Sequence, residues 1–321
     1  MKKILATDGI DKEAVEMLRK KGFEVEEKFY PEEELKDKIK DIDIIIVRSA
    51  TKIKKEIIDE ALKTKNLKMI IRAGVGLDNI DVNYARENGI VVRNTPSASS
   101  NAVAELVLCE MLVLARNVKI ANLKLGEGIW DKKNLKGTEI YGKTIGIIGF
   151  GNIARKLAQK AYNLGMKVMY NDIAEYENEG KDYKFANFDE IIENADYITV
   201  HTPLTEKTKY MFNKDVFKRM KNTAFLINCA RGGIVNEKDL LEALNQNQIA
   251  GAAIDCFENE PRPLEDIVNH PRVTVTPHIG ASTNEAQKRI AYEIVDIVSD
   301  YYDCLLEGAA GVNYTNRVNI I

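Results

Sequence analysis

The chain has 321 residues, long enough for two domains that each bury a core of their own. Hydrophobic residues make up 45% and charged residues 30%, a composition that fits a globular protein and excludes a disordered or fibrous one. The net charge is −3, with acids and bases spread along the whole sequence, so we expect neither nucleic acid nor an anionic membrane as a partner.

Cysteine usage and the N-terminus predict a cytoplasmic protein without a structural metal. The cysteines are far apart and form no C-x-x-C pair, which argues against a zinc site and a disulfide framework; they are Cys109, Cys229, Cys256 and Cys304. "MKKILATDGI" leads directly into a strand-like run without a cleavage site. The longest apolar stretch, "AVAELVLCEMLVLA", is too short and too interrupted by acids to span a bilayer.

The first part of the chain alternates strand and helix patterns with short links. Strands are predicted at residues 3–8, 23–29, 43–49, 68–74 and 89–94, and helices at 11–22, 31–39, 54–62 and 81–89. This alternation is typical of a parallel sheet covered by helices on both faces.

A second alternating region follows the turn-forming segment "NTPSASSN". It begins with a helix over 101–116 that is apolar on nearly all sides and therefore needs burial between domains or subunits. Strands are predicted at 144–149, 167–172, 197–203, 224–230, 251–257 and 273–278, and a long helix over 284–308 returns to the first domain. The predicted fold class is α/β with two doubly wound parallel sheets. A Rossmann domain (99–287) is inserted into a flavodoxin-like substrate domain (1–98 plus 288–321).

A dinucleotide fingerprint opens the second region. Gly149, Gly151 and Ala154 form G-x-G-x-x-A between a β-branched strand and a helix, and the next strand ends at Asp172. Gly149 permits a tight turn, Gly151 lets the backbone approach a pyrophosphate, and the helix N-terminus binds it. Asp172 would accept hydrogen bonds from the ribose and repel a 2′-phosphate, which favours NAD over NADP. The alternative is an ordinary glycine-rich turn of a doubly wound sheet.

Three histidines are available for the proton transfer that accompanies hydride transfer. His270 precedes a strand and is expected in an exposed turn, whereas His201 and His278 both follow strands. His278 is the better acid–base candidate, because Glu260 lies near the end of the preceding strand and could orient its ring. A solvated loop acid is the alternative for Glu260.

The stretch "FLINCARGGIV" places Arg231 at the carboxyl end of an apolar strand. Its planar guanidinium could hold the carboxylate and carbonyl of a 2-oxo acid. The alternative is a surface arginine paired with a carboxylate.

"NCARGGIVNE", "GAAIDCFENEP" and "TPHIGAST", with "GFGNIA" upstream, resemble the D-2-hydroxyacid dehydrogenase family over essentially the whole chain. The resemblance implies catalytic roles for Arg231, Glu260 and His278. It implies cofactor contacts, in addition to Gly149, Gly151 and Asp172, at Asn152, Ile153, His201, Thr202, Pro203, Cys229, Ala230, Asp255 and Gly280. Cys256 stands where an aliphatic residue is common in the family, and Asn236 where aspartate is common.

Within that family, "VRSATK", "IRAGVGLDNID" and "NTPSASSNAVAEL" are most similar to the branch that oxidises 3-phospho-D-glycerate. Arg48 and Arg72 stand at strand ends and suit a phosphate, and the N–H groups of Val75 and Gly76 suit a carboxylate. For each arginine a salt bridge to a nearby acid is the alternative. The chain stops soon after "GVNYTN", so no C-terminal regulatory domain is expected.

The expected function is NAD-dependent oxidation of 3-phospho-D-glycerate to 3-phosphohydroxypyruvate in serine biosynthesis. Reduction of hydroxypyruvate, glyoxylate or another 2-oxo acid is the alternative chemistry. An NAD(H)-sensing corepressor is the alternative of another class, because fold alone does not settle function. A homodimer is expected from the apolar helix and the segment around Trp130.

Overall fold

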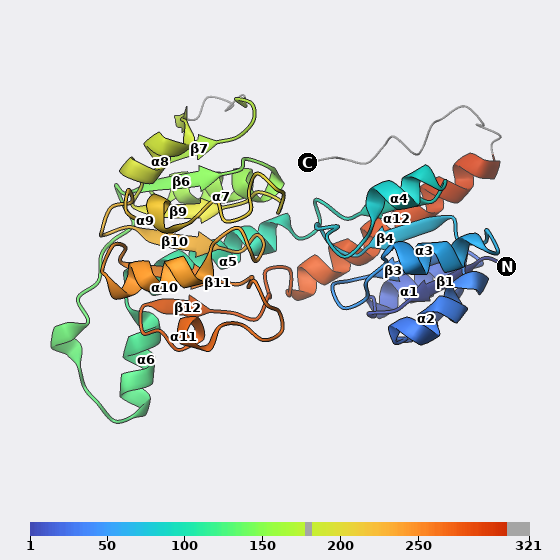
Figure 1. The fold of residues 1–321 in the computed structure, drawn as a ribbon, viewed down its shortest axis with the longest axis horizontal. Helices are drawn as coiled ribbons and strands as arrows, with labels where there is room; N and C mark the ends of the chain where they lie inside the picture. Colours follow the sequence, from blue (N-terminus) through green and yellow to red (C-terminus); the bar gives the residue numbers. More distant parts are fainter. Residues whose placement is uncertain (177–181, 307–321) are drawn as a thin grey trace. The chain divides into compact units, whose positions relative to one another are not determined.

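The computed structural model describes residues 1–176 and 182–306 and divides into two compact units. Unit 1 comprises Met1–Ser99 together with the chain from Ala281 onward, and unit 2 comprises Ser100–Gly280 (Figure 1). The expected first boundary, after residue 98, lies one residue from this division. The expected second boundary, after 287, differs from it, because residues 281–287 belong to unit 1.

Unit 1 is a parallel five-stranded sheet in the order β2-β1-β3-β4-β5. Its strands are β1 (Lys3–Ala6), β2 (Glu24–Glu27), β3 (Ile44–Val47), β4 (Met69–Arg72) and β5 (Val91–Asn94). Its helices are α1 (Lys12–Lys20), α2 (Glu32–Lys38), η1 (Ile39–Asp41), α3 (Lys55–Leu62), α4 (Val82–Glu87) and α12 (Asn284–Leu306).

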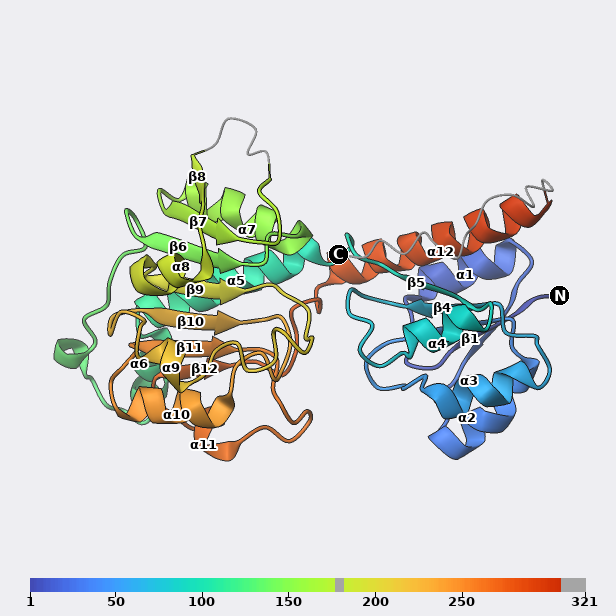
Figure 2. The ribbon, with the colours of Figure 1, turned by 45° about the horizontal axis from the view of Figure 1, so that its top comes forward.

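The strands of unit 1 are apolar on both faces because helices cover both. Ile44 and Ile46 pack with α1 and α12, whereas Ile45 and Val47 pack with α2 and α3. Figure 2 shows α1 and α12 side by side on one face of this sheet. The strand order reverses between β1 and β3, which is the flavodoxin-like switch point, so ligands are expected beyond the carboxyl ends of these two strands.

Unit 2 is a parallel seven-stranded sheet in the order β12-β11-β10-β9-β6-β7-β8. Its strands are β6 (Thr144–Ile148), β7 (Lys167–Asn171), β8 (Tyr183–Phe185), β9 (Tyr197–Val200), β10 (Phe225–Asn228), β11 (Gly251–Ile254) and β12 (Val273–Val275). Its helices are α5 (Ser100–Ala115), α6 (Val118–Gly126), η2 (Lys132–Asn134), α7 (Asn152–Asn163), α8 (Phe188–Asn194), α9 (Lys214–Phe217), α10 (Glu237–Asn245) and α11 (Glu265–Val268).

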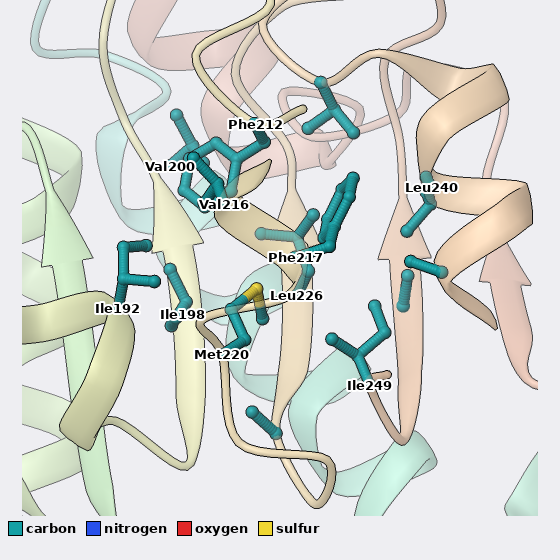
Figure 3. Packing of buried hydrophobic residues seen from close by; sticks show 14 of the residues in the cluster. Ile192, Ile198, Val200, Phe212, Val216, Phe217, Met220, Leu226, Leu240 and Ile249 are labelled. Atoms are coloured by element: carbon teal, nitrogen blue, oxygen red, sulfur yellow. The ribbon is translucent and has the colours of Figure 1, made fainter. Parts of the chain in front are cut away.

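Two apolar cores hold unit 2 together, one on each face of its sheet. The core drawn in Figure 3 joins Leu226 and Ile198 of the sheet to α8–α11, with Phe217 and Leu240 fully buried. The other face packs against α5 and α7. The fold class predicted from the sequence, with its two doubly wound parallel sheets, is therefore confirmed.

Among residues 1–176 and 182–306, no helix combines the length and the apolar character needed to cross a bilayer.

Candidate active site

The carboxyl edge of the unit 2 sheet collects most of the residues that the sequence singles out. The strand order reverses between β6 and β9, so Gly149 and His201, which follow these strands, stand at the switch point where such sheets bind nucleotides. Four further strands end at the same edge. The residues that follow them are Asp172 (after β7), Cys229, Ala230 and Arg231 (after β10), Asp255 (after β11) and His278 (after β12).

The turn after β6 leaves room for a phosphate because Gly149 has no side chain. Gly149 adopts a φ of +86°, and a Cβ there would lie 2.8 Å from the carbonyl oxygen of His201. Gly151 is the N-cap of α7 and has no side chain. The N–H groups of Asn152 and Ile153 in the first turn therefore receive no side-chain cap. A helix of this length carries a positive dipole end that favours a pyrophosphate.

Asp172 braces this turn with its carboxylate. Oδ2 accepts a hydrogen bond from the N–H of Phe150 at 2.5 Å, and Oδ1 accepts one from the N–H of Ile173 at 2.6 Å. Each oxygen still has acceptor capacity, since a carboxylate oxygen takes about two hydrogen bonds. The acid thus lies beside the phosphate turn, where the ribose of a dinucleotide is expected.

The segment after β9 contains an unsatisfied polar atom. Oγ1 of Thr202 is buried without a hydrogen-bond partner, and its methyl group would lie 3.0 Å from a Cβ on Gly149. Pro203 follows in the same partly exposed loop. His201 is a neutral ring: its Nε2 lies 3.0 Å from Oγ1 of Thr199, and desolvation lowers its pKa to about 4. A buried hydroxyl of this kind is a ready partner for a bound cofactor.

Glu260 and His278 form a pair. Nδ1 of His278 lies 2.9 Å from Oε2 of Glu260, and Oε1 of Glu260 accepts a hydrogen bond from the N–H of Phe257 at 3.0 Å. Burial raises the pKa of Glu260, but the hydrogen bonds from His278 and Phe257 and the charge of Arg231 outweigh burial, so its pKa is lowered overall. The carboxylate is therefore ionised at neutral pH, and it holds the proton of the imidazole on Nδ1 and leaves Nε2 as the basic nitrogen.

Asp255 fixes the backbone around His278. Its buried carboxylate accepts hydrogen bonds from Oγ1 of Thr276 (2.6 Å) and from the N–H groups of Ile279 (2.8 Å) and Gly280 (3.0 Å). Its carbonyl accepts one from the N–H of His278 at 2.9 Å. His278 has a φ of +53°, a left-handed conformation that these bonds stabilise.

Arg231 is placed by the turn that follows β10. Nδ2 of Asn228 donates to the Arg231 carbonyl at 2.9 Å, and Nη1 of Arg231 donates to the carbonyl of Ala230 at 2.5 Å. The next residue must be glycine, since a Cβ on Gly232 would lie 1.8 Å from the carbonyl oxygen of Phe257. The double glycine after Arg231 thus lets the β10 turn approach the chain that leads to Glu260. The positive charge of Arg231 contributes to the lowered pKa of the Glu260 carboxyl.

The residues expected to bind substrate in unit 1 lie near its switch point. Arg48 follows β3: its N–H donates to Oδ2 of Asp8 at 2.6 Å, and its guanidinium bonds Oε1 of Gln287. Arg72 ends β4 and donates to Oγ of Ser49 at 3.1 Å. Both side chains are half-buried.

Val75 and Gly76 lie in the half-buried loop after β4. Nδ2 of Asn94 donates to the Val75 carbonyl at 2.7 Å and so holds this loop in place.

Comparison with known proteins identifies the family. Residues 108–280 match the model of the D-isomer specific 2-hydroxyacid dehydrogenase, NAD binding domain. The chain belongs to this family. Unit 2 is therefore the NAD-binding domain, and the prediction of NAD as cofactor is confirmed.

Several relatives and solved structures match most or all of this chain. A D-3-phosphoglycerate dehydrogenase of Methanocaldococcus jannaschii is 42% identical over 100% of the chain, which spans 60% of that relative's length. A hydroxypyruvate reductase of Thermotoga maritima is also 42% identical, over 92% of this chain and 96% of its own. The crystal structure of an NAD-dependent formate dehydrogenase from Staphylococcus aureus in complex with NAD has a TM-score of 0.83 and 32% identity, covering 94% and 96% of the two chains.

The residues of unit 2 fit a dinucleotide. The turn at Gly149 leaves room for a pyrophosphate, and the buried Thr202 hydroxyl, which has no hydrogen-bond partner, can bond to the cofactor. The Asp172 carboxylate can accept hydrogen bonds from a ribose.

Sequence reasoning missed several residues that support the site. Glu110 of α5 is buried and accepts a hydrogen bond from Thr274 of β12. Its only signal in the sequence is that it is an acid within an apolar helix. Asp8 and Gln287 hold Arg48 in place. These contacts join segments far apart in the chain and leave no mark in local spacing.

Proposed function

We propose that this dehydrogenase oxidises the C2 hydroxyl of a D-2-hydroxy acid with NAD, and that its substrate is 3-phospho-D-glycerate. The observation that carries the chemistry is the hydrogen-bonded Glu260–His278 pair at the sheet edge where Arg231 also lies. When bound, NAD supplies the two-electron acceptor for the hydride from C2.

In this proposal Nε2 of His278 takes the proton of the C2 hydroxyl. Nδ1 keeps its proton and its bond to Glu260, whose ionised carboxylate stabilises the imidazolium that forms. In the reverse direction the same nitrogen returns the proton to the carbonyl oxygen. The catalytic residues are then His278 and Arg231, with Glu260 orienting the histidine.

Arg231 would bind the substrate carboxylate and the oxygen on C2. Its guanidinium can donate two parallel hydrogen bonds, and its charge stabilises the oxygen as the carbonyl forms or is reduced. The turn that fixes its backbone limits the freedom of the side chain.

The phosphate of the substrate is assigned to Arg48 and Arg72, and its carboxylate also to the N–H groups of Val75 and Gly76. Two observations support this. The Arg48 guanidinium donates to an amide oxygen rather than to a carboxylate. Arg48 follows β3 and Arg72 ends the neighbouring β4, so both lie at the ligand-binding edge. The 3-phosphoglycerate dehydrogenases among the relatives point to the same substrate.

A second candidate is reduction of hydroxypyruvate, because the Thermotoga relative with that name is equally identical and matches in length. The two candidates differ only in the phosphate. Oxidation of NADH by the purified chain with phosphohydroxypyruvate, hydroxypyruvate and glyoxylate separates them. We expect the largest kcat/KM for phosphohydroxypyruvate; a larger value for hydroxypyruvate would establish the second candidate instead.

We also propose that the protein is a homodimer. The single chain leaves large apolar side chains of α5, α6 and the following segment exposed, with Trp130 at 80%; the others are Leu112, Val118, Leu123, Leu125 and Ile129. A patch of this kind is typical of a subunit interface. Sedimentation should give twice the chain mass, and a monomer at micromolar concentration would overturn this assignment.

A further inference from the structure

A cysteine lies against the proposed acid–base pair. Cys256 follows β11, and one ligand atom each of Cys256, Glu260 and His278 lie within 4.8 Å of one another. Cys256 is 2% exposed and forms no disulfide, whereas the side chains of Glu260 and His278 are 37% and 36% exposed. We call these three residues the Cys256–Glu260–His278 cluster.

We propose that the Cys256–Glu260–His278 cluster is a binding site for a thiophilic divalent cation, with Zn²⁺ as the ion of best fit. A thiolate, an imidazole nitrogen and a carboxylate oxygen are the three ligand types that zinc takes in proteins. Three protein ligands with an open fourth position for water is the arrangement of zinc sites that remain accessible.

The separations suit such an ion after a small adjustment. Tetrahedral zinc with bonds of about 2.0–2.3 Å holds its ligand atoms roughly 3.3–3.6 Å apart. The 2.9 Å distance between His278 and Glu260 would lengthen slightly. The sulfur of Cys256, which lies within 4.8 Å of the ligand atoms of both residues, would move closer to them. The half-exposed His278 and Glu260 give the ion its entry path, and the buried cysteine forms the floor of the site.

Charge also balances at the site. Binding releases the thiol proton, so a thiolate and a carboxylate neutralise the two positive charges of the ion, and the imidazole binds in its neutral form. The positive charge of Arg231, which helps to lower the pKa of the Glu260 carboxyl, also opposes a cation at that carboxylate. This favours an ion that gains a covalent thiolate bond over Mg²⁺ or Ca²⁺.

Binding there would inhibit the dehydrogenase. In this geometry the ion binds Nδ1, so the ring proton moves to Nε2. The bond to Glu260 is then broken, and Nε2 no longer offers the lone pair that would accept the substrate proton. The inhibition rests on the proposed function, whereas the binding does not.

The test uses the full chain, reduced and freed of metal, with Zn²⁺ and Co²⁺ as probes. Zinc affinity is measured by competition with a chromophoric chelator, and cobalt binding by its absorption spectrum. The variant is Cys256→Val, an aliphatic residue as is common at this position in the family, and the matched control is Cys109→Ser, which removes an exposed thiol of α5.

We expect wild type and Cys109→Ser to bind one Zn²⁺ per chain and to lose activity with it, reversibly on addition of EDTA. Cys256→Val should bind at least about 100-fold more weakly, because even partners of metal ligands contribute 10- to 100-fold. Cobalt in the wild type should show a thiolate-to-metal charge-transfer band.

Equal zinc affinity of wild type and Cys256→Val, or cobalt binding without the thiolate band, would overturn the proposal. The cobalt spectrum needs no variant and therefore decides even if Cys256→Val does not fold. Zinc binding by a chain that reduces none of the 2-oxo acids would count against the proposed function and leave the metal site standing.

Discussion

Nδ1 of His278 lies 2.9 Å from Oε2 of Glu260. Glu260 belongs to the loop after β11, whereas His278 belongs to the loop after β12. Glu260 is held in turn by the N–H of Phe257, and the backbone of His278 by Asp255. Both partners of the pair are thus held by residues that directly follow β11.

Glu260→Gln should lower kcat by on the order of 10²-fold while KM changes little, because the neutral amide cannot stabilise an imidazolium. Steady-state oxidation of 3-phospho-D-glycerate measures both constants. Glu265→Gln, an exposed acid at the start of α11, is the control and should retain wild-type kcat. A Glu260→Gln enzyme with unchanged kcat would remove Glu260 from the mechanism.

Asp172→Asn should relax the choice of cofactor. The amide oxygen can still accept a hydrogen bond from Phe150, but the charge that repels a 2′-phosphate is gone. We expect the ratio of kcat/KM for NAD to that for NADP to fall by at least about tenfold. Glu175→Gln, an exposed acid of the same loop, should leave this ratio unchanged. An unaltered ratio in Asp172→Asn would mean that another group reads the ribose.

Arg72→Ala should raise KM for phosphohydroxypyruvate by on the order of 100-fold and affect hydroxypyruvate much less, because a charge-assisted bidentate contact with phosphate is lost. Lys68→Ala removes a positive charge just before the opposite end of β4 and serves as the control. Equal effects of Arg72→Ala on both substrates would show that this arginine maintains unit 1 rather than recognising phosphate.

Glu110→Gln should stabilise the protein above acidic pH. Burial raises the pKa of Glu110, Asp255 adds to this, and the hydroxyl of Thr274 and the charge of Lys119 offset part of it. The Glu110 carboxyl therefore binds its proton more tightly in the folded state than in the unfolded state, where its pKa is near 4.5. Between 4.5 and the raised pKa, wild-type stability falls as pH rises.

The glutamine keeps an oxygen for Thr274 without the charge. We expect a gain of roughly 1 kcal/mol at neutral pH, or about 2 °C or more in Tm, and no gain near pH 4. Thermal unfolding followed across this pH range measures it, with Glu105→Gln on the exposed side of α5 as control. A gain that is the same at every pH would indicate better packing rather than relief of a buried charge.

The regular part of the fold could be predicted from the sequence because the apolar runs are clear. Runs such as "DIIIVRS" and "TIGIIG" are buried on both sides by helices, and they became β3 and β6. The short strand β8 was not predicted, because "YKF" lies at the edge of the sheet and has no apolar run. Helix α6 was also missed, since it buries none of its residues and so has no amphipathic pattern.

The site was predictable where strand ends carry the chemistry. Arg231, Asp255 and His278 each follow an apolar strand, and parallel strands bring their carboxyl ends to one edge. The bracing contacts were not predictable. Gln287 reaches Arg48, and Thr274 reaches Glu110, across large separations in sequence that no local pattern records.

The central claim is that His278 transfers the substrate proton, and His278→Asn tests it most directly. NADH oxidation with phosphohydroxypyruvate should fall by about 10²- to 10⁴-fold in kcat, while the affinity for NADH, followed by its fluorescence in the absence of substrate, stays within about twofold of wild type. A His278→Asn enzyme that binds NADH normally and turns over at the wild-type rate would contradict the account.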